Sequence, residues 1–350
     1  MKHPAKLRLR LRGAAALLAL LALAAGAVFA LRGRAQAAEW AFEPEPGQVF
    51  AAFGNSFAAC SSTQLQIYGP EGELCLRAEL PQPAPALAAS DTRLAVWSAG
   101  GESFSVFDAQ GGLGSVEAEG ELLDLRLRGD MAVAAVMGGE GLGLVTVYDG
   151  LLRPVYRWHA QTAWPLAAEL SPEGDALAVL AASEAGGQLR LFSLGSEEER
   201  ARFESPGEYF IDLAWMDGGL CLLSEDRAVF LDEGGAQTGE YRFGSARLRD
   251  CAFGGDFALL VLEEAGQVSL VSLDASGGLI AQLSPGRDFV SAEAEKDKIA
   301  VLYSDGAAVY NKNLRERGSG AQAAGAQALL LRGDGETLAV FAGAVRTGLA

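Results

Sequence analysis

The sequence contains few side chains suited to acid–base or metal chemistry. Its two histidines are His3 and His159, and His3 lies in a short basic N-terminal segment. A Ser-His-Asp arrangement would depend on His159 alone, and a metal site with several histidine ligands cannot be assembled. His159 follows Trp158 at the end of an apolar run, where we expect a surface histidine rather than a catalytic base. We therefore predict no catalytic, cofactor-binding or metal-binding residues.

The cysteines show no spacing typical of a metal or redox site. They form no Cys-x-x-Cys pair, so zinc binding and thioredoxin-like chemistry are not indicated. We expect Cys60 and Cys221 to pack in the core, because each lies in a short apolar run. Cys221 and Cys251 are the pair best placed for a disulfide in an exported protein. The sequence leaves open the disulfide state of Cys60, Cys75, Cys221 and Cys251.

The acidic residues form no recognisable site along the sequence. There is no Asp-x-Asp-x-Asp calcium loop and no pair of carboxylates with the spacing of a glycosidase. The acidic runs at residues 197–199 and 263–264 lie in or beside expected turns, where solvated charge is the ordinary explanation. Folding can still bring distant carboxylates together. Four tryptophans are expected in the core or between strands: Trp40, Trp97, Trp164 and Trp215.

Charge is distributed unevenly along the chain. Residues 1–38 hold seven basic residues and no acid, so residues 39–350 hold 21 basic and 45 acidic residues, a net charge of −24. Such a surface repels phosphate backbones and anionic lipid headgroups, and we expect no nucleic-acid partner. Solubility is the ordinary explanation of this acidity, and a basic partner is the alternative.

Residues 13–31 form an uninterrupted apolar run of 19 residues, including nine alanines and six leucines. As a helix this run is about 28 Å long, enough to cross a bilayer core. Five Lys or Arg residues precede it, and only Arg32 and Arg34 follow. This bias predicts a signal anchor with residues 1–12 as a cytoplasmic tail, residues 32–38 as a linker, and the remainder outside the membrane.

A cleaved signal peptide is the competing interpretation of the same segment. The tract Ala35-Gln36-Ala37 fits the small-x-small cleavage pattern, so the protein would be secreted after cleavage near Ala37. The length of the apolar run favours the anchor, because signal peptides usually have apolar regions of about 7 to 15 residues. Both interpretations predict an extracytoplasmic location for residues 39–350.

A short strand of apolar, small and apolar residues recurs eight times after a turn. The small central residues are separated by 37, 37, 46, 43, 37, 42 and 39 positions, a mean of about 40. This is the period of one four-stranded propeller blade. We expect a neighbouring sheet to come close at each small residue. The central residues are Ala58, Ala95, Ala132, Ala178, Cys221, Ala258, Ala300 and Ala339.

A second repeat keeps step with the first and completes the predicted blade. Apolar or aromatic strands run into turns, as in Val106-Phe107-Asp108, Val147-Tyr148-Asp149 and Ser272-Leu273-Asp274. The last unit lacks room for an outer strand, whereas residues 39–43 have no partner of their own. Pairing the two would close the ring and leave no open sheet edge. The sequence thus predicts an all-β, eight-bladed β-propeller over residues 39–350, with seven blades as the alternative because the strand at residues 343–350 is weak.

These motifs resemble those of known propellers. Asp108 and Asp149 end their strands where WD40 repeats place a Trp-Asp pair, and Ser171-Pro172-Glu173-Gly174-Asp175 resembles a turn of TolB-like propellers. The tracts at residues 108–112 and 274–278 are similar to the turn of quinoprotein-type repeats. A single helix followed by a diverged propeller resembles the layout of the uncharacterised bacterial family domain of unknown function 5711. The resemblance implies a fold and no activity.

Abundant repeats without catalytic motifs favour a non-enzymatic module. We expect an extracytoplasmic propeller that binds a protein or ligand at the cell envelope and is attached to the membrane through residues 13–31. The linker would reach at most about 24 Å, which keeps the propeller near the bilayer. The alternative is an exported enzyme, or a quinone- or cation-binding protein, that uses carboxylates in the central channel.

Overall fold

The computed structural model describes residues 38–348 apart from 138–140 and 197. The chain divides into two units, Met1–Ala38 and Glu39–Ala350. The predicted tail at 1–12, the anchor at 13–31 and the cleavage site near Ala37 lie outside the described residues. No helix within the described part of the chain is long and apolar enough to cross a membrane.

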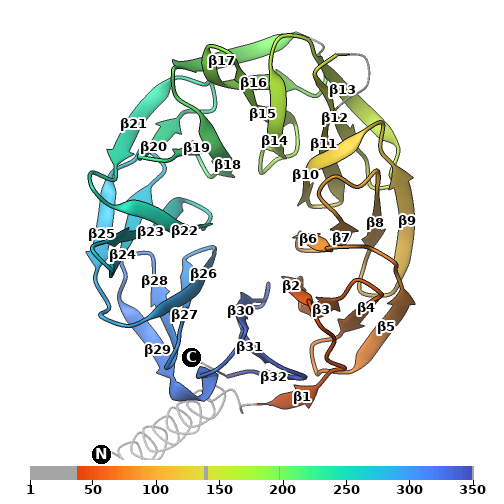
Figure 1. Cartoon of the computed structure of the whole chain (residues 1–350), viewed down its shortest axis with the longest axis vertical. Helices are drawn as coiled ribbons and strands as arrows, with labels where there is room; N and C mark the ends of the chain where they lie inside the picture. The colour runs from red at the N-terminus through yellow and green to blue at the C-terminus, as the bar shows by residue number, and fades with distance from the viewer. Residues whose placement is uncertain (1–37, 138–140, 197, 349–350) are drawn as a thin grey trace, which may run out of the picture. The chain divides into compact units, whose positions relative to one another are not determined.

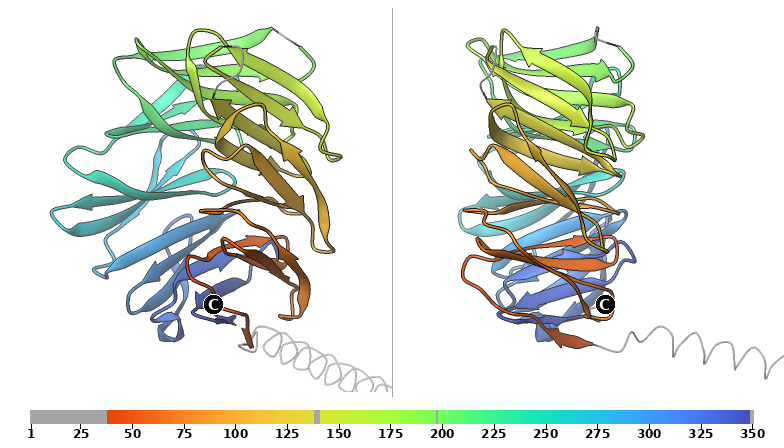
Figure 2. Two further views of the ribbon diagram at one scale, coloured as in Figure 1. Left: turned by 45° about the vertical axis from the view of Figure 1, so that its right-hand side comes forward. Right: turned by 90° about the vertical axis from the view of Figure 1, so that its right-hand side faces the viewer.

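The second unit consists of eight four-stranded antiparallel sheets arranged around a central axis (Figure 1). The strands within each sheet are twisted, as the tilted views show (Figure 2). In seven blades the four strands follow one another along the chain, from the axis to the rim. Eight blades are therefore confirmed, and the seven-bladed alternative is wrong.

The first four blades begin at residue 49. Blade 1 contains β2 (Val49–Phe53), β3 (Ser56–Cys60), β4 (Gln64–Tyr68) and β5 (Leu74–Glu79), and blade 2 contains β6 (Ala86–Ala89), β7 (Leu94–Trp97), β8 (Ser103–Phe107) and β9 (Gly112–Glu117). Blade 3 contains β10 (Glu121–Arg128), β11 (Met131–Met137), β12 (Gly143–Tyr148) and β13 (Pro154–Ala160), and blade 4 contains β14 (Trp164–Leu170), β15 (Ala176–Ser183), β16 (Gly186–Ser193) and β17 (Glu199–Pro206).

The other four blades complete the ring. Blade 5 contains β18 (Phe210–Met216), β19 (Gly219–Ser224), β20 (Arg227–Leu231) and β21 (Gln237–Arg242), and blade 6 contains β22 (Arg247–Phe253), β23 (Phe257–Glu264), β24 (Gln267–Asp274) and β25 (Leu279–Leu283). Blade 7 contains β26 (Phe289–Glu295), β27 (Lys298–Tyr303), β28 (Gly306–Asn311) and β29 (Glu316–Gly320), which is followed by a short 3-10 helix (Ala321–Ala323). Blade 8 contains β30 (Ala328–Leu331), β31 (Thr337–Phe341), β32 (Ala344–Arg346) and β1 (Glu39–Ala41).

Strand position explains the hydrophobic pattern of the sequence. Second and third strands such as β15 and β16 are buried on both faces, because a sheet packs against each side of them. Outer strands such as β17 alternate between half-buried and exposed residues, because one of their faces is open to solvent. The buried side chains form eight apolar clusters, one between each pair of adjacent blades.

The recurring small residues lie at these interfaces, but they do not all face the same way. Five of them, including Ala58 and Cys221, pack toward the following blade. Ala132, Ala258 and Ala339 pack toward the preceding blade. Successive residues of a strand point to opposite faces, so the sequence alignment of these three units is displaced by one residue.

Strands from the two ends of the propeller close the ring as predicted. β1 pairs with β32 through Glu39 opposite Arg346 and Trp40 opposite Val345. The backbone N–H of Phe42 then donates to the carbonyl of Gly343 at 3.0 Å. The third strand of blade 8 covers Ala344–Arg346, which is shorter than the predicted 343–350.

The aspartates that end the third strands stabilise tight turns. Asp108 Oδ1 accepts the backbone N–H groups of Gln110 and Gly111, each at 2.8 Å. The same arrangement recurs in four further blades, where a side-chain oxygen accepts two N–H groups of the turn that follows it. The residues concerned are Asp149, Asp232, Asp274 and Asn311.

Candidate functional site

The innermost strands of the eight blades surround the axis (Figure 1). Those of blades 3 to 7 have seven or eight residues, whereas β2, β6 and β30 have four or five. We call the first group the charged arc (β10, β14, β18, β22 and β26) and the second the apolar arc (β30, β2 and β6). The candidate site lies on the charged arc.

Each innermost strand of the charged arc contains a β-bulge near its start. Pairing with the second strand skips one residue, so that this residue has no partner in the ladder. A bulge of this kind changes the direction of the side chain at the skipped position. The skipped residues are Leu123, Leu166, Ile211, Arg249 and Val290.

A carboxylate follows the bulge by one or three residues in every blade of the charged arc. Four of these five carboxylates accept the backbone N–H of a residue on the innermost strand of the next blade, at 3.0 or 3.1 Å. They therefore join neighbouring blades at the axis. The acceptor and donor pairs are Asp124 with Ala168, Glu169 with Trp215, Asp250 with Ala292, and Glu293 with Leu331, and the fifth carboxylate is Asp212.

Arg126 binds three of these carboxylates at once. Its Nε contacts Asp124 Oδ2 at 3.0 Å, its Nη2 contacts Asp212 Oδ1 at 2.6 Å, and its Nη1 contacts Glu169 Oε2 at 3.2 Å. Nη1 also donates to the carbonyl of Leu213 at 2.6 Å. One side chain on β10 thus connects blades 3, 4 and 5. We call Arg126 and its three carboxylate partners the Arg126 network.

Burial shifts the titration of four of these five carboxylates, which together we call the channel carboxylates. Removal from water raises the pKa of Asp124, Glu169 and Asp250 above the usual range, although Arg126 partly opposes the shift at the first two. Glu293 has no ion-pair partner among the described residues, and burial raises its pKa to about 7, with a further contribution from Glu295. Glu293 is therefore partly protonated near neutral pH.

A cavity of about 520 Å³ lies beside the Arg126 network. Arg126, Glu169 and Asp212 contribute to its polar wall, and Trp97 and Trp215 to its apolar wall. The Nε, Nη1 and Nη2 atoms of Arg126 all donate hydrogen bonds within the protein. The network is therefore suited to holding blades together rather than to binding an incoming anion. Within the described ranges, no three His, Cys, Asp or Glu side chains are grouped so as to hold a metal ion.

The structure places the predicted chemical residues away from this site. His159 is exposed on the outer strand β13. All four cysteines are free thiols in the structure, and Cys221 and Cys251 pack in the same apolar cluster without a bond between them. Cys60 and Cys221 are buried in the core as predicted, and burial raises the pKa of Cys60 to about 12.

The tryptophans and acidic runs have mixed outcomes. Trp215 is buried, whereas Trp164 is exposed at the first residue of β14, so its predicted core position is wrong. Trp40 and Trp97 are half-buried, and each has a buried Nε1 without a hydrogen-bond partner in the described structure. Glu263 pairs with Arg249 at 2.8 Å at the end of β23.

Sequence reasoning missed the channel carboxylates. A signal was present, because in five successive units an acid interrupts the apolar innermost strand, as in Asp124 between Leu123 and Leu125. Blade order makes neighbours of these acids, which lie about forty residues apart in sequence. Arg126 and Asp212, which form an ion pair, are 86 positions apart in the sequence.

Comparison with known proteins shows the family to which the chain belongs. The family of unknown function DUF5711 matches residues 39–341, which confirms the resemblance noted from the sequence. No protein with a curated description matches the chain in sequence.

Solved propellers share the fold at low sequence identity. BamB from Moraxella catarrhalis is 13% identical with a TM-score of 0.59, and the alignment covers 89% of this chain and 98% of BamB. The computationally designed protein Ika8 is 12% identical with a TM-score of 0.66, covering 89% and 98% of the two chains. Sqt1 from Saccharomyces cerevisiae is 9% identical with a TM-score of 0.61 and the same coverage. At these identities the likeness concerns the fold alone.

Proposed function

We propose that this chain, which belongs to the family of unknown function DUF5711, is a non-enzymatic interaction module that binds a protein or ligand at the cell envelope. The observation that carries the proposal is the use of the channel groups. Arg126 and four of the five channel carboxylates form hydrogen bonds with residues of neighbouring blades. This makes the ring a rigid support for surface loops, with its principal charged groups committed to structure.

The proposed location is outside the cytoplasmic membrane, with residues 13–31 as a single-pass anchor and the N-terminus in the cytoplasm. The support is the apolar run and the Lys and Arg bias around it. A reporter fused after residue 350 should be active only when exported, and activity of a cytoplasmic reporter at that position would contradict the proposal. The mass of the mature protein distinguishes an intact anchor from cleavage near Ala37.

The interaction role is tested in intact cells with the full-length protein. A photoreactive residue placed at one exposed surface position at a time should give discrete protein adducts from a limited set of positions. A protein that interacts through one face should give adducts there and none from the opposite face. Absence of adducts from every exposed position on both faces would reject the module.

A second candidate function uses the channel carboxylates to bind a cation or quinone, or to catalyse a reaction. The observation that favours it is Glu293, whose pKa of about 7 keeps a proton available near neutral pH. Calorimetric titration of the purified chain with Ca²⁺, Mg²⁺ and a soluble quinone tests this function. Binding that disappears in Glu293→Gln and persists in Glu198→Gln would favour the channel site over the interaction module.

A further inference from the structure

Exposed apolar side chains gather at one face of the propeller. We call this the start face, because the innermost strands begin there and the second strands end there. Trp164 and Leu166 lie at the start of β14, and Tyr209 and Ile211 lie at the start of β18 in the adjacent blade. All four are exposed, and Ile211 is 64% exposed. We call these four residues the start-face patch.

The backbone itself produces this exposure. Leu166 and Ile211 are the residues skipped by the bulges of β14 and β18, and their neighbours Pro165 and Phe210 are buried. The chain therefore turns one apolar residue out of the ladder while the residue before it stays in the core. The Tyr209 hydroxyl donates to the carbonyl of Ser183 at 3.2 Å, which holds blade 5 against the hairpin of blade 4.

The same kind of bulge exposes one more apolar residue, Val290 on β26, but the skipped residue of the blade before it is Arg249, so no second pair of adjacent blades repeats this pattern. Most other exposed large apolar residues lie singly on outer strands or turns, such as Leu74 on β5, Leu151 in the turn before β13, and Leu279 on β25. Single exposed apolar residues are normal on soluble proteins, whereas a group on adjacent elements marks an interaction surface. Two neighbouring bulges that both present large aliphatic residues form such a group.

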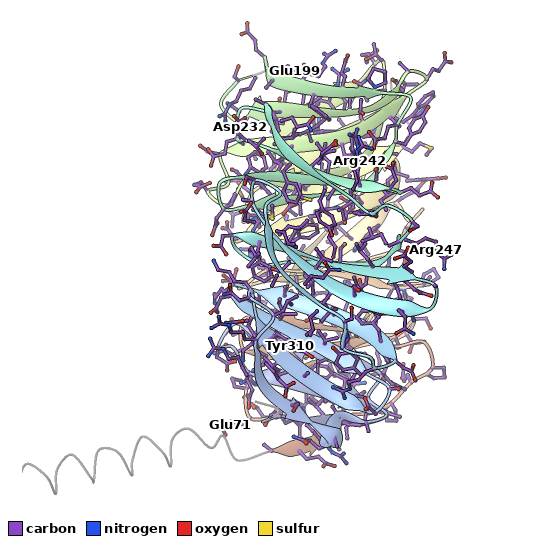
Figure 3. All side chains as sticks on the ribbon, turned by 90° about the vertical axis from the view of Figure 1, so that its left-hand side faces the viewer. Glu71, Glu199, Asp232, Arg242, Arg247 and Tyr310 are labelled. Carbon is purple, nitrogen blue, oxygen red and sulfur yellow. The ribbon has the colours of Figure 1, made fainter. Side chains whose placement is uncertain are left out.

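Charge around the patch indicates what kind of partner fits it. Glu184 and Glu225 are exposed in the hairpins that follow the second strands of blades 4 and 5, at the same face. Neither forms an ion pair within the described part of the chain. Asp226 adds a third carboxylate, 4.0 Å from Arg242. Two arginines lie at the same face, because β21 ends at Arg242 and β22 begins at Arg247, and the edge view shows both toward the opposite side of the disc from Asp232 (Figure 3).

We propose that the start-face patch docks a segment of a partner protein that presents apolar side chains flanked by lysine or arginine. This inference rests on the proposed interaction module and names the surface and the partner chemistry. The apolar side chains would cover Leu166 and Ile211, and the cations would meet Glu184 and Glu225. The net charge of −24 on residues 39–350 steers such a segment toward the propeller and disfavours an anionic bilayer as the occupant.

The test uses the purified full-length chain and a fluorescent synthetic peptide of leucines flanked by lysines. Anisotropy should show that Leu166→Ser combined with Ile211→Ser weakens binding about tenfold or more, because central apolar contacts dominate interface energies. Glu184→Gln combined with Glu225→Gln should weaken binding about threefold and reduce its dependence on salt. The matched control Leu279→Ser changes an exposed leucine on β25 and should leave binding unchanged.

Three outcomes would overturn the proposal. The first is equal peptide binding by the patch variant and Leu279→Ser. The second is equal binding of a peptide with glutamates in place of the lysines. The third is a dimer, detected by sedimentation, that dissociates only in the patch variant and is not displaced by the peptide. A second copy of the chain would then be the occupant of the patch. Unchanged thermal unfolding of the variants shows that the fold is intact.

A crosslinking experiment in cells separates this proposal from the proposed function. A photoreactive residue at position 211 should give a discrete protein adduct, and one at position 279 should give none. Adducts from position 279 alone would preserve the interaction module and reject the start-face patch. Absence of adducts from these and all other exposed positions would reject both.

Discussion

The charged arc and the apolar arc join neighbouring blades at the axis by different means. In the charged arc, side-chain carboxylates accept backbone N–H groups of the next blade, and Arg126 connects three blades. In the apolar arc, the short strands β30, β2 and β6 are regular and contain no charged residue. A propeller can therefore build one ring with polar bonds on one side and apolar packing on the other.

The apolar arc includes the closure of the ring, where this choice has a physical advantage. Phe57 packs against Phe42, Phe50 and Tyr68, with ring centroids between 5.6 and 6.0 Å apart. Arg332, which is 4% exposed, adds a hydrogen bond of 2.9 Å to the carbonyl of Pro70 in blade 1. Apolar packing does not titrate, so the part of the closing contact that these aromatic rings provide does not depend on pH.

Phe57→Ala should give the largest loss of stability and should not depend on pH. Removing a buried aromatic ring leaves a cavity at the closing interface, and such changes lower the free energy of unfolding by about 4 kcal/mol. Urea unfolding followed by tryptophan fluorescence measures the effect. Phe57→Leu is the control and should cost about 1 kcal/mol. An effect of Phe57→Ala that disappears at low pH would show that the closure depends on charge after all.

Arg126→Met should destabilise the charged arc by about 3 kcal/mol, because Asp124, Glu169 and Asp212 lose the cation between them. The control Arg153→Met removes a cation that is 69% exposed and paired with Asp149, and it should leave the unfolding midpoint close to that of the natural protein. Equal effects of the two substitutions would show that the Arg126 network does not hold the blades together.

Glu293→Gln should stabilise the protein by about 2 kcal/mol near pH 8 and have little effect near pH 4. Burial raises the pKa of Glu293 to about 7 in the fold from an ordinary glutamate value of 4.5. The folded state therefore holds a proton that the unfolded state releases, so the contribution of Glu293 to stability falls as pH rises between these two values and stays lost above them. Thermal unfolding across this range measures the slope.

The same measurement on Glu198→Gln, an exposed glutamate, provides the control for Glu293. The stability of the Glu198→Gln variant should equal that of the natural protein at every pH. If the stability of the natural protein does not fall between the two pKa values of Glu293, the charged arc does not differ from the apolar arc in its response to pH.

The repeat period determined most of the fold in advance. Eight small residues about forty positions apart were enough to predict the blades and the pairing of β1 with the last blade, because each unit must bury its faces against neighbours. The one-residue displacement at Ala132, Ala258 and Ala339 was not predictable from that pattern. Small residues occur on both faces of these strands, and only packing shows which face meets which blade.

The candidate site was much less predictable than the fold. A bulge depends on how two strands pair, and the sequence around Ile211 is an apolar run that does not show where the pairing skips a residue. The partners of Arg126 come from three blades, so recognising them requires the blade order and the radial position of each strand. Trp164 was misplaced for a related reason, since it occupies the first position of β14, where the start face is open.

The smallest effects should come from the aspartate-stabilised turns after the third strands, which occur in blades of both arcs. Asp108 follows the third strand of blade 2, whose innermost strand belongs to the apolar arc, and Asp274 ends the third strand of blade 6, whose innermost strand belongs to the charged arc. Each accepts two backbone N–H groups of its turn, at 2.8 Å for Asp108 and 2.9 Å for Asp274. Replacing either aspartate with alanine should lower the free energy of unfolding by about 1 kcal/mol, and asparagine should largely restore it.

Hydrogen bonds from Ser276 and Gly278 lower the pKa of Asp274 although partial burial opposes the shift. The contribution of Asp274 is therefore present above the ordinary aspartate pKa and is lost as pH falls through the lower folded value, the opposite sign to Glu293. Urea unfolding of both alanine variants at neutral and acidic pH tests the comparison. A much larger loss for Asp274→Ala than for Asp108→Ala would mean that the two arcs differ in their outer turns as well as at the axis.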